Sequence, residues 1–310
     1  MKLDLNKVNL GDCIDVMRTF PENSIACCIT DPPYNYEFIG HKWNDAEVKR
    51  RTERIKNSKT MVKNIPYGSG LSGGVRNKRW YEKNRNNDLE YMKWSEKWTT
   101  ELFRICKAGA SVAVFNSARS IAHVQIALEN SGFYTRDVLV YRRNSGIPRG
   151  LNLEKKLEKM GVSNSEKWHG WHSAFRNEWE AIVLVQKPLI NNYWKTLQTT
   201  NVGVFKTVNT DGSFQSNILE NLSKKDKSEK YKHCTVKPLR LIKKLVDTLV
   251  PLHKENVVLD PFAGSGTTLV AAQELGFDFV GIEIEANYIP IIEERLKKSE
   301  AYQKTHASLF

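Results

Sequence analysis

Four consecutive residues, Asp31-Pro32-Pro33-Tyr34, combine types that could bind and activate a planar amino group, and they follow the apolar run 25–29. The prolines fix the backbone and remove two N–H donors, which leaves carbonyl oxygens and the Asp31 carboxylate as acceptors. Tyr34 adds a flat aromatic face for stacking. Acceptors on both N–H bonds of an aromatic amine would concentrate its lone pair on nitrogen and make it more nucleophilic. A structural turn with an exposed aspartate is the alternative interpretation.

A second segment, 259–268 (LDPFAGSGTT), predicts a nucleoside site. Gly264 and Gly266 allow a tight turn between a strand and a helix whose N–H groups point at a ligand. Glu283 ends the next predicted strand, at the spacing where a carboxylate can accept both hydroxyls of a ribose. No Gly-Lys-Ser/Thr follows, and the third glycine of a dinucleotide fingerprint is missing, so a nucleoside without pyrophosphate fits better. Packing alone is the alternative role for these glycines.

Alternating strands and helices must position these two segments. Short apolar runs predict buried strands, and amphipathic stretches between them predict helices. Strands are expected at 25–29, 111–115, 138–141, 181–185, 257–259 and 279–282, and helices at 119–130, from Pro238 to Val250, up to Leu275 and at 287–298. Segments 257–282 form a βαβ unit. In such sheets, ligands bind beyond the carboxyl ends of the strands, which is where both segments fall.

The distribution of charge indicates a polyanionic partner. The chain has 310 residues and a formal net charge of +12. Residues 35–100 carry +7 and residues 141–240 carry +9, whereas 1–34, 101–140 and 241–310 carry −2, +1 and −3. All eight tryptophans fall in the two basic blocks. Basic charge with stackable rings favours nucleic acid over solvated loops with packed tryptophans, which is the alternative.

Several classes of protein are disfavoured. No apolar run approaches the roughly 20 residues of a membrane span, and the N-terminus lacks the apolar region of a signal peptide. Five cysteines without a CxxC pair indicate reduced thiols, so we expect a cytoplasmic protein. His169-x-x-His172 has a possible metal spacing, but we interpret WHGWH as a packed aromatic segment and expect no metal.

Together, Asp31–Tyr34 and Asp260–Thr268 resemble the β-class of DNA amino-methyltransferases, in which the catalytic motif precedes the S-adenosyl-L-methionine motif. Minor matches are Gly11-Asp12-Cys13, Phe103–Ser117 and His233–Pro238, the last with His-Cys where the family commonly has His-Pro. The matches cover more than half of the chain. The resemblance implies an α/β, Rossmann-like S-adenosyl-L-methionine-dependent methyltransferase sheet with helices on both faces and basic insertions for DNA recognition.

The resemblance also implies roles for individual residues. Asp31, Pro32, Pro33 and Tyr34 would be catalytic and hold a base flipped out of double-stranded DNA. Glu283 would bind the cofactor ribose, Asp12 would contact the adenine, and Thr235 and Lys237 would face the cofactor carboxylate. The complete set implied for the cofactor is Asp12, Cys13, Thr235, Lys237, Asp260, Phe262, Gly264, Ser265, Gly266, Thr267 and Glu283. Asp at position 31, where some members have Ser, favours adenine N6 over cytosine N4.

By the same resemblance, the catalytic core would comprise 1–39, 96–188 and 233–298. A basic loop or lid would occupy 40–95, a target-recognition region 189–232, and a C-terminal tail 299–310. A cognate restriction enzyme and a homodimer are possible partners. The expected activity is methylation of adenine N6 in double-stranded DNA. The rivals are cytosine N4 methylation, methylation of RNA or of a protein amide, and a DNA-binding module that keeps an inactive cofactor fold.

Overall fold

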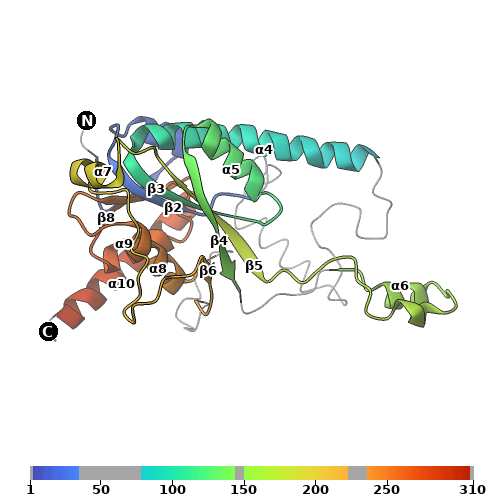
Figure 1. The fold of residues 1–310 in the computed structure, drawn as a ribbon. Helices are drawn as coiled ribbons and strands as arrows, with labels where there is room; N and C mark the ends of the chain where they lie inside the picture. Colours follow the sequence, from blue (N-terminus) through green and yellow to red (C-terminus); the bar gives the residue numbers. More distant parts are fainter. Residues whose placement is uncertain (1–2, 35–77, 144–149, 223–235, 308–310) are drawn as a thin grey trace.

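The structure, a computed structural model, describes residues 3–34, 78–143, 150–222 and 236–307. Residues 40–77 of the predicted lid, and Thr235 of the predicted cofactor set, therefore lie outside the described residues. Within them, helices and strands form an α/β sandwich from which one segment projects (Figure 1).

The centre of the fold is an eight-stranded sheet in the order β1-β8-β7-β2-β3-β5-β4-β6. Strand β5 is antiparallel to both of its neighbours, and the other pairings are parallel. The strands are β1 (Lys7–Leu10), β2 (Ile25–Thr30), β3 (Cys106–Asn116), β4 (Tyr134–Arg142), β5 (Trp179–Gln186), β6 (Ile218–Leu219), β7 (Val257–Asp260) and β8 (Asp278–Glu283). From β2 the chain continues to β3 on one side, whereas from β7 it continues to β8 on the other side. The carboxyl ends of β2 and β7 therefore lie at a topological switch point, where open α/β sheets bind ligands.

Helices cover both faces of the sheet, as expected for this topology. In Figure 1, α4 and α5 lie on one face, and α8, α9 and α10 lie on the other. The helices are α1 (Cys13–Arg18), α4 (Lys78–Ile105), α5 (Ile121–Asn130), α6 (Leu153–Lys159), α7 (Tyr193–Thr200), α8 (Leu239–Leu249), α9 (Thr267–Glu274) and α10 (Ile289–Ala307), with 3₁₀ turns at Ser165–Trp168 and Ala286–Tyr288.

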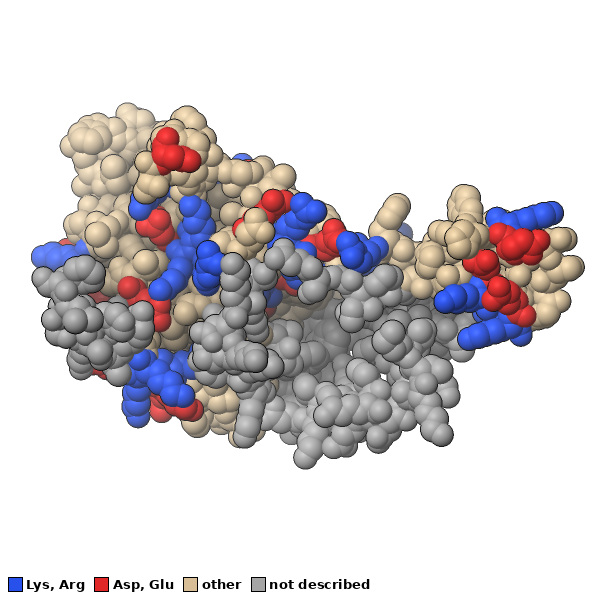
Figure 2. All heavy atoms as spheres, turned by 90° about the horizontal axis from the view of Figure 1, so that it is seen from below, with Lys and Arg blue, Asp and Glu red and all other residues tan. Residues whose placement is uncertain are grey.

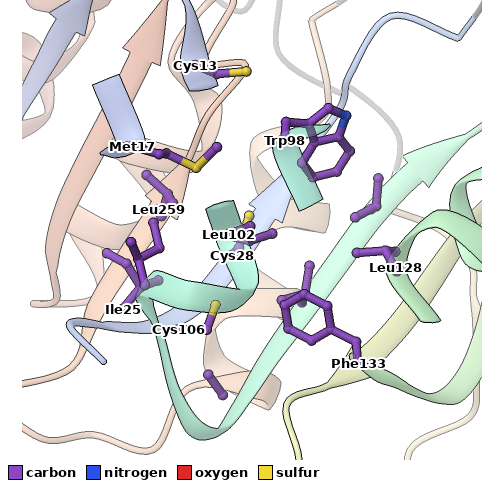
Figure 3. Packing of buried hydrophobic residues seen from close by; sticks show 14 of the residues in the cluster. Cys13, Met17, Ile25, Cys28, Trp98, Leu102, Cys106, Leu128, Phe133 and Leu259 are labelled. Carbon is purple, nitrogen blue, oxygen red and sulfur yellow. The ribbon is translucent and has the colours of Figure 1, made fainter. Parts of the chain in front are cut away.

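Alternating strand residues divide the core into two hydrophobic clusters. Along β3, Val112 and Val114 face the cluster under α4 and α5, whereas Ala113 and Phe115 face the cluster under α8 and α9. Figure 3 shows the first cluster, where Leu102 of α4 lies beside Cys28, and where Trp98 of the same helix and Met17 of α1 also belong. Full burial of one such side chain contributes roughly 1.5–3 kcal/mol. Both faces are buried because parallel strands cannot leave either face to water.

The structure corrects the predicted boundary between the lid and the core at residue 95. A single helix, α4, begins at Lys78 and runs through that boundary to Ile105. Tyr91 and Ser95, which fall within the predicted lid, are buried under the sheet. The physical reason is an apolar stripe at helical spacing, formed by Tyr91, Trp98, Leu102 and Ile105, which the basic residues of the opposite face obscured in the sequence.

The structure describes the predicted C-terminal tail, 299–310, as far as Ala307. Helix α10 continues to Ala307, and Ser299 is buried, with its hydroxyl 3.3 Å from a Glu274 carboxylate oxygen. This contact with α9 extends the helix beyond the point where the apolar pattern weakens. The other predicted helices and strands are confirmed with shifts at their ends, and the structure has further elements, among them β1, α1, α7 and β6.

Three general findings concern the described residues. Four cysteines there are buried and form no disulfide. Within the same ranges, the search for a helix long and apolar enough to cross a bilayer finds none. No three His, Cys, Asp or Glu side chains of the described part gather as metal ligands would, and His169 instead contacts Glu154, with 2.9 Å between Nδ1 and Oε2.

Candidate active site

The two turns that the sequence singled out lie side by side, although they are more than 200 residues apart in the chain. Strand β2, which precedes Asp31, pairs in parallel with β7, which precedes Pro261. The Thr30 hydroxyl donates a 2.7 Å hydrogen bond to Asp260, and Thr268 reaches the carbonyl oxygen of Ile29 at 3.3 Å. The two strand ends therefore form one site at the carboxyl edge of the sheet.

Glycine geometry shapes the second turn. Gly266 has a φ of 76°, a left-handed conformation that costs other residues free energy. A Cβ at Gly266 would also lie 2.8 Å from Ile292. Buried Arg295 of α10 fixes the turn through two hydrogen bonds. Its guanidinium donates to the Ser265 carbonyl at 2.6 Å and to the Thr267 hydroxyl at 3.0 Å. The turn is therefore rigid, with the start of α9 behind it.

Glu283 lies against this turn, as its predicted role requires. Its carboxylate accepts the backbone N–H of Gly264 at 2.7 Å and that of Glu285 at 2.8 Å. Burial raises its pKa from 4.5 to about 7, although these N–H groups act in the opposite direction. Burial likewise raises the pKa of Asp260 to about 6. A carboxylate held in this way can accept the hydroxyls of a ribose on its remaining lone pairs.

Asp12 and Cys13 reach the same place from β1. The N–H of Gly11 donates to the Glu283 carbonyl at 2.9 Å, so the end of β1 lies beside the end of β8. The Asp12 carboxylate caps α1 by accepting the N–H of Ile14 at 2.9 Å. Cys13 is buried, and desolvation raises the pKa of its thiol. Asp12 and Cys13 therefore follow directly after the residue that contacts Glu283, and the buried Cys13 side chain packs in the core.

The Asp31 turn presents a carboxylate and a phenol in contact. Pro32 is buried and Pro33 is exposed. The Tyr34 hydroxyl donates to Asp31 at 2.5 Å. Burial, followed by the nearby Asp31 charge, raises the pKa of Tyr34 well above its usual value, so the phenol stays protonated and available as a donor. An incoming amine would therefore share the Asp31 carboxylate with the Tyr34 hydroxyl.

Lys237 contacts the turn that contains Asp31 and Tyr34. Its ammonium lies 2.5 Å from Asp31, 3.0 Å from the Tyr34 hydroxyl and 3.4 Å from a carboxylate oxygen of Glu180. It also lies 5.4 Å and 5.0 Å from the ring centres of Tyr34 and Phe115. Burial lowers the pKa of Lys237, but the two carboxylates outweigh this effect and raise it overall. A contact with a cofactor carboxylate stays a prediction.

Sequence reasoning missed Glu180, which lies at the start of β5. Its carboxylate lies between the Lys237 ammonium and the Arg143 guanidinium, the latter at 3.0 Å. Arg143 follows β4, so this ion-pair network connects the β4–β5 connection to Asp31. A charged residue at the head of an otherwise apolar strand was the available signal.

The aromatic residues of α4 were also missed as part of the site. The ring centres of Trp94 and Trp98 lie 5.8 Å and 5.4 Å from that of Phe262 in the glycine turn. The Tyr91 hydroxyl accepts a hydrogen bond from Asn116 at 2.9 Å, at the end of β3. Trp98, which is fully buried, and Trp94, which is partly buried, therefore pack against the predicted cofactor turn. Their spacing of four residues was the signal in the sequence.

The predicted recognition region, 189–232, is described up to residue 222 and is partly integrated into the core. Thr196 and Val202 are buried, and β6 pairs with β4. Lys206 forms an ion pair with Asp247 at 2.8 Å. Trp194, in contrast, is 67% exposed. A recognition role for this region remains a prediction.

Comparison with known proteins agrees with this geometry. Residues 25–294 match the sequence profile of the family N6_N4_Mtase, described as DNA methylase. Among curated proteins, the chain is 33% identical to the type II methyltransferase M.HindIII of Haemophilus influenzae, over 92% of this chain and 93% of that protein.

Solved structures with the same fold include TTHA0409 of Thermus thermophilus in complex with S-adenosyl-L-methionine, with a TM-score of 0.54 and 18% identity over 94% of this chain and 95% of that one. The cytosine-N4-specific PvuII DNA methyltransferase has a TM-score of 0.57 and 14% identity, over 93% of this chain and 85% of that one. At these identities, the likeness concerns the fold.

Proposed function

Since this chain belongs to the N6_N4_Mtase family of DNA methylases, we propose that it transfers a methyl group from S-adenosyl-L-methionine to the N6 of an adenine flipped out of double-stranded DNA. The observation that carries the proposal is the 2.7 Å hydrogen bond between Thr30 and Asp260. This bond joins the strand end before Asp31, whose turn offers acceptors for an amino group, to the strand end before the glycine turn, whose residue types suit a nucleoside.

The residues of the second turn fit the cofactor. The Gly264 N–H of the turn lies 2.7 Å from the buried Glu283 carboxylate, so this carboxylate is held beside the start of α9. Glu283 would accept the ribose hydroxyls, and Phe262 and Gly264 would line the pocket. Asp12 would contact the adenine. When bound, the cofactor supplies an electrophilic methyl on a cationic sulfonium.

On the substrate side, Asp31 would accept an N–H bond of the target amine and direct its lone pair toward the methyl group. Tyr34 would stack on the flipped base, and the Pro32 carbonyl would accept the second N–H. Lys237 and Tyr34 hold the Asp31 carboxylate in place through hydrogen bonds that are both 2.5 Å long. As the C–N bond forms, the bond between the methyl group and the sulfonium sulfur would break and leave its electron pair on sulfur, which becomes a neutral thioether. The cationic nitrogen would then lose one proton to water. Positioning the two reactants supplies most of the rate.

Asp at position 31 favours adenine N6, because family members that methylate cytosine N4 commonly carry Ser there. The fold likeness to PvuII methyltransferase, whose name specifies cytosine N4, keeps that reaction as the second candidate. The two reactions differ in product. After incubation of the protein with S-adenosyl-L-methionine and DNA of mixed sequence, digestion to nucleosides and mass spectrometry should detect N6-methyl-2′-deoxyadenosine. Detection of N4-methyl-2′-deoxycytidine alone would refute the adenine assignment.

Replacing the carboxylate tests the site. Asp31→Ala should reduce methyl transfer by at least about 100-fold, because it removes the acceptor for the reacting amine, while cofactor affinity changes little. Asp247→Ala, which removes a carboxylate of similar size in α8 that pairs with Lys206, is the matched control and should retain activity. An equal loss of cofactor binding in Asp31→Ala would contradict the assignment of Asp31 to the substrate.

A further inference from the structure

Residues 150–178, called the arm below, project from the body of the protein between β4 and β5. Figure 1 shows α6 far from the sheet, at the end of two extended chain segments. Because β4 runs parallel to β2 and β5 runs opposite, the arm leaves from the carboxyl edge of the sheet, where Asp31 and the glycine turn also lie. This segment falls within the range that the sequence predicted as catalytic core.

The arm has its own internal order. Its two sides pair at a bridge between Asn152 and His172, and Leu153 donates its N–H to the Trp171 carbonyl at 3.0 Å. Asn152 caps α6 by accepting the N–H of Lys155 at 3.0 Å. At Gly150, a Cβ would lie 2.8 Å from the backbone nitrogen of Ala174, so the two sides approach closely. The arm is therefore a defined hairpin.

This hairpin contributes no residue to the hydrophobic core, since none of residues 150–178 is buried. It nevertheless carries large apolar side chains, of which Phe175 is 99% exposed, Met160 63% and Trp171 62%. Leu151, Val162 and Trp168 are also exposed. Folded protein rarely gathers such side chains at a surface unless that surface meets a partner. The rings of Trp168 and Trp171 pack edge to face, with 6.1 Å between their centres, so the predicted packing of WHGWH occurs within the arm while the other surfaces of both rings remain exposed.

The chemistry and position of the arm indicate which partner it meets. Phe175 is five residues before Glu180, so their Cα atoms are at most about 17 Å apart, and Glu180 contacts Lys237 beside Asp31. A duplex has a major groove about 12 Å wide. DNA that delivers a base to Asp31 would therefore pass within reach of Phe175.

The arm carries five Lys and Arg against four Glu, which gives it a small net charge of +1. Two of the acidic side chains of the arm are engaged within it, Glu154 with His169 and Glu178 with Arg176. Four lysines lie on α6 and the following turn, at positions 155, 156, 159 and 167. Figure 2 shows these basic side chains at the outer end of the arm, with acidic ones between them. Lysines can contact phosphates while the aromatic residues contact bases.

We propose that the arm binds duplex DNA beside the flipped nucleotide, with its lysines on the phosphates and with Phe175 and Trp171 packed against the bases or sugars next to the vacated position. Aromatic wedges of this kind support a distorted duplex. The inference rests on the proposed function and deepens it, because it names a surface for the DNA substrate outside the predicted recognition region.

The direct test is photo-crosslinking from the arm. A photoreactive benzoylphenylalanine at position 175 should form an adduct with a labelled 40-base-pair duplex of mixed sequence when irradiated. The same residue at position 252 is the matched control, because Leu252 is 81% exposed and precedes β7 at the opposite edge of the sheet. An adduct with a second protein chain instead of DNA, or equal DNA adducts from both positions, would overturn the proposal.

Affinity provides the second measurement. The double variant Trp171→Ala/Phe175→Ala should bind the same duplex at least about tenfold more weakly, because each substitution removes a ring that stacks on the nucleic acid. Leu252→Ala should bind as the unmodified protein does. The double variant should keep its thermal stability and cofactor affinity, because neither side chain is buried. Unchanged DNA affinity in the double variant would refute the role of the arm.

These outcomes separate the arm from the proposed function. If the unmodified protein methylates DNA, and the double variant binds and methylates it equally well, then the arm proposal fails and the enzymatic assignment stands. If the unmodified protein transfers no methyl group to DNA but position 175 still crosslinks to the duplex, then the proposed reaction fails and the arm remains a DNA-binding surface.

Discussion

The ionisation of Glu283 should control cofactor binding near neutral pH. Burial raises its pKa to about 7, so the ionised fraction is about one tenth at pH 6 and about nine tenths at pH 8. The ionised carboxylate accepts ribose hydroxyls more strongly than the neutral acid does. If only the ionised form binds well, the affinity for a ligand that carries the ribose should increase about tenfold between these two pH values.

Isothermal titration calorimetry with 5′-methylthioadenosine can measure this change. This ligand has the adenine and ribose of the cofactor but no amino acid group, so its own titration does not interfere. The unmodified protein should show the tenfold change, and Glu283→Gln should bind more weakly with an affinity that is independent of pH. Equal affinity of the unmodified protein at pH 6 and pH 8, together with unchanged binding by the variant, would refute the assignment of Glu283.

The same group should act on stability with the opposite dependence on pH. A folded-state pKa above the ordinary 4.5 means that the folded protein retains the proton longer than the unfolded chain does. The free energy of unfolding should therefore fall as pH rises from about 4.5 to about 7, by up to roughly 3 kcal/mol. Urea unfolding at pH 5 and pH 8 should show a smaller fall in Glu283→Gln than in the unmodified protein, because Asp260, with its pKa raised to about 6, still contributes a fall in the variant. Equal pH dependence in the two proteins would contradict the mechanism.

Two further substitutions test the neighbouring geometry. Lys237→Met should reduce the free energy of unfolding by about 3 kcal/mol, because Asp31 loses its counter-charge and Glu180 keeps only the Arg143 guanidinium. Adding Asp31→Asn should recover part of this loss in urea unfolding, and purely additive losses would argue against the network. Gly266→Ala should lower both thermal stability and cofactor affinity, because its Cβ would lie 2.8 Å from Ile292. Gly276→Ala is its control, with a similar φ of 79° and no atom within 4 Å of a Cβ, and equal effects at both positions would show that backbone strain alone is responsible.

Much of the sheet and most of the candidate site could be predicted from local sequence. Buried parallel strands are apolar throughout, so β2, β7 and β8 were recognisable from short runs of residues. Helix α4 was not, because its apolar stripe is interrupted by many basic and polar residues, and because its partners on the sheet come from distant segments. A helix whose stability depends on tertiary packing has a weak local signal.

The sequence by itself determined the chemical groups of this protein: the carboxylate and phenol at Asp31 and Tyr34, the glycine turn at 264–266 and the carboxylate of Glu283. These depend on residue types and short spacings, which are local properties of the chain. Only the tertiary structure decided which of them meet. Parallel pairing of β2 with β7 places the two turns together, and the ion pairs of Lys237 with Asp31 and Glu180 join residues from three separate segments. The projection of the arm was likewise decided by folding, because burial depends on the neighbours that each segment finds in three dimensions.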